Sequence, residues 1–122
     1  MPLANNHVFS EERISVQTTS IGGTPVVSYM GVPVRSQIVK ISLVAQGAIT
    51  TADCAIAIAV NGTNNTALAG TLPVASAAAG QIATWVPSSP TYVNEDDVLR
   101  FTPSGASGAS IGGQFTVYFR PQ

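Results

Sequence analysis

Residues 54–60 read CAIAIAV, the longest apolar run of the chain, and Asn61-Gly62 follows directly. In an extended strand the cysteine, the isoleucines and the valine share one side, and Ala55, Ala57 and Ala59 share the other. Apolar residues on both sides predict a strand that is central, or whose alanine side is covered by something else. The Asn-Gly pair predicts a tight hairpin turn at its end. Seven residues are far too few to span a bilayer.

Similar short runs of Val, Ile, Thr and aromatic residues extend in both directions, separated by Gly, Pro, Asn and Ser clusters. Polar and apolar residues alternate in the two longest of these runs, which predicts half-exposed strands over residues 37–46 and 113–120. Shorter strands are predicted over residues 14–18, 26–29, 67–74, 81–86 and 98–102. In the last of these, Leu99 and Phe101 are expected to point inward. In residues 113–120 the apolar side is that of Phe115, Val117 and Phe119, and the opposite side is that of Thr116, Tyr118 and Arg120. About eight strands without a convincing helix predict an all-β chain, an antiparallel β-sandwich with a jelly-roll-like arrangement.

The first thirteen residues, MPLANNHVFSEER, are polar and aperiodic. They predict an extended N-terminal arm over residues 1–13, followed by one β-sandwich domain over residues 14–122. Val8 and Phe9 give the arm an apolar anchor with which it can become ordered on a neighbour. The candidate residues for binding a partner through the arm are Asn5, Asn6, His7, Val8, Phe9, Glu11, Glu12 and Arg13.

Charge is scarce in this chain of 122 residues, because only 9% of them are charged, against about 25% in an ordinary soluble domain. Five basic and six acidic residues leave a net charge of −1. That balance excludes the basic footprint of a nucleic-acid-binding protein and a polybasic membrane patch. The first twenty residues lack the pattern of a secretory signal, and a single cysteine cannot form an internal disulfide, so synthesis in a reducing cytoplasm is expected.

No constellation of residues predicts an enzyme or a cofactor. His7 is the single histidine and belongs to the predicted arm, whereas a catalytic triad needs an imidazole that is held in place. Cys54 opens the apolar run and is expected to be a small buried hydrophobe. The acidic cluster Glu95, Asp96 and Asp97 offers oxygen ligands for Ca²⁺, but a solvated turn before a strand is the favoured interpretation.

The surface itself is the most informative feature, because it must consist mainly of small uncharged side chains. Such a surface packs against another chain with little desolvation cost, which predicts burial in an oligomer or a larger assembly. Trp85 is expected in the core, with an interface anchor as the alternative. The possible oligomer interface comprises Ala55, Ala57, Ala59, Trp85 and Tyr118.

Five stretches resemble the small capsid decoration (cement) proteins of tailed bacteriophages. They are residues 47–53 (GAITTAD), 55–63 (AIAIAVNGT), 69–74 (AGTLPV) with 78–80 (AAG), 93–101 (VNEDDVLRF) and 112–120 (GGQFTVYFR). Such proteins typically carry a Gly-Asp pair before the strand that begins here at Val98, and Asp96 takes the glycine position. The resemblance covers roughly residues 26–120 and consists of turn and strand patterns.

The resemblance implies a jelly-roll-like dimer or trimer on the outer surface of an icosahedral capsid. Its partners would be the major capsid protein and other copies of itself, with no nucleic acid, no membrane and no cofactor, and its place would be the virion. The implied role is structural: the protein would staple neighbouring capsid subunits, with the arm as a strap. The alternative is a trimeric fibre or receptor-binding module that recognises a host-surface glycan through Tyr29, Trp85, Tyr92 or Tyr118.

Overall fold

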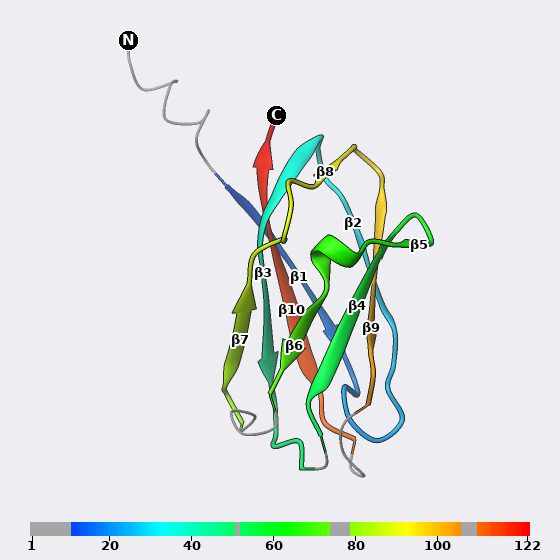
Figure 1. The fold of residues 1–122 in the computed structure, drawn as a ribbon, viewed down its shortest axis with the longest axis vertical. Coiled ribbons are helices and arrows are strands. Elements are labelled where there is room, and N and C mark those ends of the chain that lie inside the picture. The colour runs from blue at the N-terminus through cyan, green and yellow to red at the C-terminus, as the bar shows by residue number, and fades with distance from the viewer. Residues whose placement is uncertain (1–10, 51, 74–78, 106–109) are drawn as a thin grey trace.

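The computed structural model describes residues 11–50, 52–73, 79–105 and 110–122. Within them the chain forms ten strands and one short 3₁₀ turn, drawn in Figure 1. The strands are β1 (Glu12–Thr18), β2 (Ser28–Gly31), β3 (Ser36–Ala45), β4 (Cys54–Val60), β5 (Thr63–Asn64), β6 (Gly70–Leu72), β7 (Ile82–Trp85), β8 (Tyr92–Val93), β9 (Val98–Pro103) and β10 (Gly113–Pro121). The 3₁₀ turn η2 (Thr66–Leu68) lies between β5 and β6.

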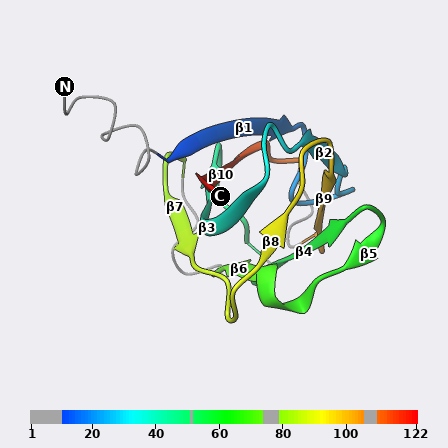
Figure 2. The ribbon, with the colours of Figure 1, turned by 90° about the horizontal axis from the view of Figure 1, so that it is seen from above.

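The strands pair antiparallel in two sheets that enclose the core (Figure 2). Sheet A has the order β1-β10-β3-β7, with β8 also on β3, and sheet B has the order β2-β9-β4-β5, with β6 also on β4. The pairings are nested along the chain: β1 with β10, β2 with β9, β3 with β7, and β4 with β6. A long hairpin rolled up in this way is a jelly roll. The predicted all-β antiparallel sandwich is confirmed.

The core lies between the inner faces of the two sheets and consists of large apolar side chains that alternate with outward-facing residues. The predicted inward residues of two strands are fully buried, among them Leu99 and Phe101 on β9 and Phe115 on β10. The rings of Phe101 and Phe115 stack across the sandwich with centroids 4.8 Å apart, so they join the sheets at its centre. Cys54 is buried as expected, and its Sγ contacts the carbonyl oxygen of Ile21 at 3.3 Å.

The predicted hairpin turn after β4 is present, because Asn61 and Gly62 both have positive φ angles of 50° and 87°, as a type I′ turn requires. The strand predicted over residues 67–74 is wrong at its start. Residues 66–68 form η2 instead. Asn65 caps this turn, because its side chain accepts a hydrogen bond from the Ala67 N–H at 3.0 Å. Of the described residues 67–73, Gly70–Leu72 form strand β6, and residue 74 of the predicted strand lies outside the described residues.

Two other strands begin two residues away from their predicted starts. β1 begins at Glu12 rather than Ile14, because Glu12 and Arg13 pair with Phe119 and Tyr118 of β10. β2 begins two residues later than expected, since the Val26 N–H donates to the carbonyl oxygen of Ser20 and not to a strand. Two residues of the predicted arm therefore belong to sheet A. Residues 5–9 of that arm lie outside the described residues.

Candidate partner-binding surfaces

The alanine side of β4 faces outward from sheet B, but its exposure falls along the strand. Ala55 is exposed, Ala57 is half-buried and Ala59 is fully buried. Ala59 lies between Arg100 on β9 and Asn64 on β5 in the cross-strand register. Longer side chains on both sides cover a small one in a sheet, so this end of the alanine face is closed within the chain itself.

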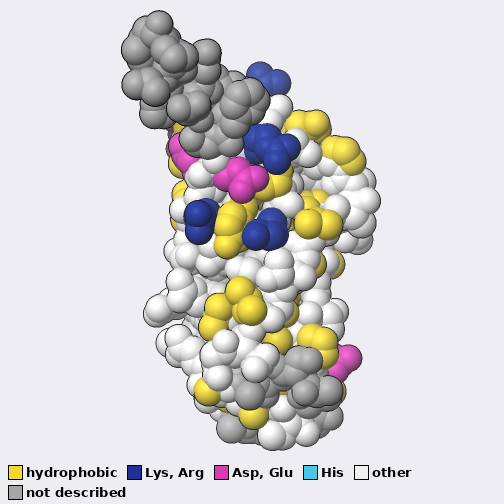
Figure 3. Space-filling view, turned by 90° about the vertical axis from the view of Figure 1, so that its left-hand side faces the viewer, with side chains coloured by type: hydrophobic (Ala, Val, Ile, Leu, Met, Phe, Trp, Pro, Cys, Tyr) yellow, Lys and Arg dark blue, Asp and Glu magenta, His cyan; other side chains and the backbone are white. Residues whose placement is uncertain are grey.

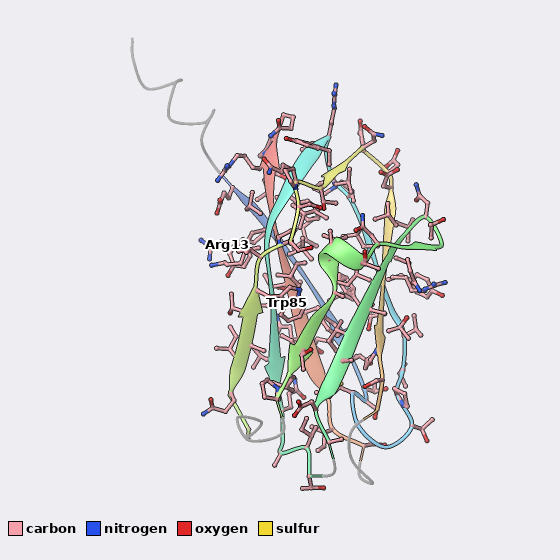
Figure 4. All side chains as sticks on the ribbon, in the orientation of Figure 1. Arg13 and Trp85 are labelled. Atoms are coloured by element: carbon pink, nitrogen blue, oxygen red, sulfur yellow. The ribbon has the colours of Figure 1, made fainter. Side chains whose placement is uncertain are left out.

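Trp85 lies between the sheets, at the seam where β7 of sheet A faces β6 of sheet B (Figure 4). Its indole Nε1 donates to the carbonyl oxygen of Leu68 at 2.9 Å, and its ring packs against the core. A Cβ on Gly70 would lie 2.1 Å from the ring carbon Cε2. The indole ring therefore packs directly against Gly70, and the half-buried tryptophan closes this side of the sandwich.

Tyr118 lies on the outer face of sheet A, with a cation on each side. Arg13 and Lys40 are its neighbours on β1 and β3 in the register. The Lys40 Nζ is 4.1 Å and the Arg13 Cζ is 5.4 Å from the centroid of the ring, which are distances for cation–π attraction. Beyond this row, Arg120 contacts the Glu11 carboxylate at 3.4 Å. The basic side chains of this face gather in the upper half of Figure 3.

The remainder of this face carries hydroxyl and amide groups in rows across the strands. Ser15, Thr116, Ser42 and Thr84 form one such row, and the hydroxyl oxygens of Ser15 and Thr116 are 2.8 Å apart. The lower half of Figure 3 shows no lysine or arginine side chain. The lysine and arginine side chains of this face therefore lie toward one end of it, together with the Glu11 carboxylate.

A hollow of about 390 Å³ opens beside the first half of β3. Apolar and polar side chains line it together: residues 37–39 of β3, residues 86–90 of the loop after β7, and Arg120 of β10. The register between β3 and β10 shifts at Tyr118/Phe119, which leaves Val39 as an extra residue on β3. Proline supplies no N–H for strand pairing, so the loop departs from β3 instead of extending β7.

The acidic residues before β9 form a hydrogen-bonded turn. The Asp97 carboxylate accepts from the backbone N–H of Asn94 at 2.8 Å and from the side-chain amide of Asn61 at 2.9 Å. These hydrogen bonds, the first above all, hold the pKa of Asp97 below its ordinary value. Asp96 has a φ of 68°, a conformation that favours glycine. This explains why the resemblance expects a glycine there.

The residues predicted as one interface therefore lie in three places: the alanines outside sheet B, Tyr118 outside sheet A and Trp85 in the seam. The aromatic residues of the glycan alternative are equally dispersed, since Tyr29 lies on β2 and Tyr92 on β8. Across the described ranges, no group of three His, Cys, Asp or Glu side chains is placed to hold a metal ion. No helix in the described part of the chain is long and apolar enough to cross a membrane.

Two features of the surface were not predicted from the sequence. The hollow is lined by residues from β3, β10 and the loop after β7, and the Arg13–Tyr118–Lys40 row depends on the alignment of three strands that are distant in the chain. The alternation of residues 113–120 did place Tyr118 on the side opposite the core, but it did not name its neighbours.

Known structures share this sandwich. A chain of the acidic stable capsid structure of Helicobacter pylori bacteriophage KHP30 matches with a TM-score of 0.58 and 20% identity, over 93% of this chain and 91% of that chain. The two chains share the sandwich along nearly their whole lengths. Dimeric latent PorU from Porphyromonas gingivalis matches with a TM-score of 0.52 and 13% identity, over 91% of this chain but 13% of that chain. The insecticidal delta-endotoxin Cry8Ea1 from Bacillus thuringiensis gives 0.50 and 16%, over 91% of this chain and 20% of that chain.

No protein-family model and no curated protein matches the sequence. At such low identities the similarity establishes the fold. In the phage structure the matching chain is almost entirely this sandwich, whereas in the other two proteins the sandwich is a small part of a larger chain.

Proposed function

We propose that this chain is a non-enzymatic structural protein of a tailed phage, which binds the outer surface of the icosahedral capsid as a homo-oligomer. The observation that carries the proposal is the match, chain for chain, with the sandwich in a phage capsid structure. The scarcity of charge supports it, because a protein with 9% charged residues gains solubility when much of its surface is covered by partners.

The mechanism is linkage between binding and assembly. A protein that binds only the assembled shell lowers the free energy of that state by mass action, and many copies multiply the effect. The contacts would run from this chain to neighbouring major capsid subunits. The part of sheet A without lysine or arginine side chains (Figure 3) suits such a contact, since few ions must lose their water.

The arm is the second part of the proposal. Glu12 and Arg13 are held in β1 and Glu11 contacts Arg120, so the segment that can act as a strap comprises residues up to Ser10. It includes the predicted partner-binding residues Asn5, Asn6, His7, Val8 and Phe9.

Co-sedimentation with empty heads that lack the protein tests the proposal. The full chain should sediment with the heads, and a chain without residues 2–10 should bind more weakly while its circular dichroism spectrum stays unchanged. A variant that keeps the arm length but replaces Val8 and Phe9 by serine is the matched control for apolar anchoring. A folded chain that fails to bind heads, yet binds host glycans on an array, would contradict the proposal in favour of the fibre alternative.

A further inference from the structure

Strand β1 is a free edge of sheet A. It pairs with β10 on one side, and no other strand of the described residues pairs with its second side. With seven residues it is the longest edge strand, since those at the other edges have at most four. A free edge presents unpaired N–H and C=O groups to any other strand. β1 contains no proline and its register against β10 is unbroken, so neither a proline nor a bulge blocks pairing at this edge.

The hydrogen bonds of sheet A show which backbone groups of β1 point outward. In an antiparallel strand the N–H and C=O of one residue point to the same side, and successive residues alternate. The Gln46 N–H donates to the carbonyl oxygen of Gly112 at 2.9 Å, so Gly112 and every second residue after it turn toward β3. The residues between them turn toward β1, where they meet Ile14 and Val16. The odd-numbered residues of β1 therefore direct their backbone groups away from β10.

Gln17 agrees with this direction, but its carbonyl group is already occupied. The carbonyl oxygen accepts from the Ser28 Oγ of β2 at 3.3 Å, because the last part of β1 runs beside sheet B (Figure 2). Arg13 and Ser15 come before that contact. No strand among the described residues pairs with their outward N–H and C=O groups. These four groups are the part of the edge that is open to a partner.

A second β1 strand complements this edge in one register. When Ile14 lies opposite Ile14 of the second copy, Arg13 of each copy lies opposite Ser15 of the other. Each of these two pairs exchanges two hydrogen bonds, so every open group finds a partner. We propose that β1 pairs in this way with β1 of a second copy of the chain, which joins the two A sheets into one sheet across a twofold axis. The inference rests on the proposed function for the homo-oligomer, to which it assigns a contact.

The neighbouring registers are less favourable. A shift of two residues in one direction places Arg13 opposite Arg13 of the second copy, and like charges directly opposite destabilise a strand pair. A shift of two residues in the other direction requires the backbone groups of Gln17, whose carbonyl oxygen is bonded to Ser28. A shift of one residue sets outward groups against inward ones and moves the side chains to the wrong face.

The side chains of β1 also favour a second copy as the partner. Ile14 and Val16 are half-buried and pack against the core, so an isoleucine opposite Ile14 would cover its remaining exposed surface. The pairing sets Glu12 opposite Val16 and leaves no two like charges directly opposite. Each copy of β1 is already extended in its own sheet, whereas a loose segment of another protein would lose conformational entropy on binding. The same patch on both copies gives an isologous contact, which closes as a dimer.

Disulfide trapping tests the register. Residues opposite each other in a non-hydrogen-bonded pair have Cα atoms about 4.5 Å apart, which lies within the range that a disulfide spans. Chains with Ile14→Cys should therefore form covalent dimers on mild oxidation. Val16→Cys is the matched control, because Val16 is half-buried on the same face but would lie opposite Glu12. Dimers should form roughly tenfold faster with Ile14→Cys, since pairing brings its thiols to a high effective concentration. Cys54 is buried within the fold.

A proline substitution tests the backbone pairing without cysteine chemistry. Ser15→Pro removes an N–H that points away from β10, so it should block the second copy and keep the fold, as proline on an edge strand does. Light scattering should show the mass falling to that of a single chain, 12.5 kDa. Ser15→Ala is the control, because it also removes the hydroxyl group but keeps the N–H, and its mass should equal that of the unsubstituted chain. Circular dichroism checks the fold of every variant.

Three outcomes would overturn the proposal: an unsubstituted chain with the mass of a single chain, equal rates of dimer formation for Ile14→Cys and Val16→Cys, and equal masses for folded Ser15→Pro and Ser15→Ala. If Ser15→Pro does not fold, the two cysteine variants decide. None of these measurements needs a capsid. Pairing through β1 in a chain that does not bind heads would remove the proposed capsid role and leave this inference. Head binding by a chain that fails the trapping test would remove this inference and leave the capsid role.

Discussion

Two stretches of the same margin of the sandwich, the seam at Trp85 and the hollow at Val86, have opposite properties. At the seam, the indole ring rests on Gly70, donates a hydrogen bond to Leu68 and closes the gap between the sheets. One residue later the pairing of β7 with β3 has ended, and Val86 is 66% exposed beside the hollow. The seam uses its large side chain to hold the fold together, whereas the hollow leaves apolar surface uncovered. Neighbouring residues thus differ in burial and in contacts, although only one position separates them.

The largest expected difference in the free energy of unfolding comes from replacing Trp85, and separately its neighbour Val86, by alanine. Trp85→Ala should lower the free energy of unfolding by about 3 kcal/mol, because it removes an aromatic side chain from the core margin. Val86→Ala should change it by less than about 0.5 kcal/mol, as expected for an exposed residue. Urea denaturation of both variants, followed by circular dichroism, measures the difference. Equal effects would show that the seam and the hollow are not distinct.

Gly70 gives the second test, since it is the other half of the seam. A methyl group there would meet the ring of Trp85 at 2.1 Å, so Gly70→Ala should destabilise the fold by about 1–3 kcal/mol through overpacking. Gly31→Ala is the control, because a Cβ at Gly31 meets nothing within 4 Å. Combining Gly70→Ala with Trp85→Ala should cost less than the sum of the two single changes. Strict additivity would mean that the ring does not rest on this glycine.

The third test concerns the turn before β9, which is held by hydrogen bonds, whereas the seam is held by apolar packing. Hydrogen bonds from Asn94 and Asn61 lower the pKa of Asp97. The ionised carboxylate is therefore favoured over its protonated form more strongly in the folded state than in the unfolded state. That contribution is present above the ordinary Asp pKa of about 3.9 and is lost as the pH falls through the lower folded value.

Asp97→Asn should therefore reduce stability at pH 7 by about 1 kcal/mol and make the decline of stability below pH 4 shallower. Glu95→Gln is the matched control, because it removes a carboxylate of the same turn. Thermal unfolding between pH 2 and pH 7 measures both profiles. If the stability of Asp97→Asn declines below pH 4 as steeply as that of the unsubstituted chain, the Asp97 carboxylate does not have this role.

The contrast also shows which parts of the molecule could be predicted from the sequence. Alternation with a period of two is a property of a single strand, so the inward residues Leu99, Phe101 and Phe115 were correctly predicted. The turn at Asn61-Gly62 was predictable because few residues accept positive φ angles. Both signals are local, and both are confirmed in the structure.

The seam and the hollow depend instead on contacts between distant segments. Trp85 was expected in the core, but nothing in its strand indicated that Gly70, from the other sheet, would support it. The hollow brings together β3, the loop after β7 and Arg120 of β10, and the register that aligns such segments is decided by the pairing of two strands and not by either one. Ala59 is buried for the same reason, since its neighbours Arg100 and Asn64 come from other strands.

The smallest effect on stability is expected from a pair of lysine substitutions. The pair compares the hollow with another exposed apolar position. Val86→Lys would place a charge in the recess, whereas Ile82→Lys would place one on the same outer side of β7, outside the residues that line it. Both side chains are exposed, at 66% and 57%, so each substitution should change the free energy of unfolding by less than about 0.5 kcal/mol. If the hollow is part of the contact between copies in the proposed homo-oligomer, Val86→Lys should lower the average mass measured by light scattering toward that of a single chain, 12.5 kDa. Ile82→Lys should leave the mass unchanged, and a loss of mass in both variants would assign the contact to the whole edge of sheet A instead of the hollow.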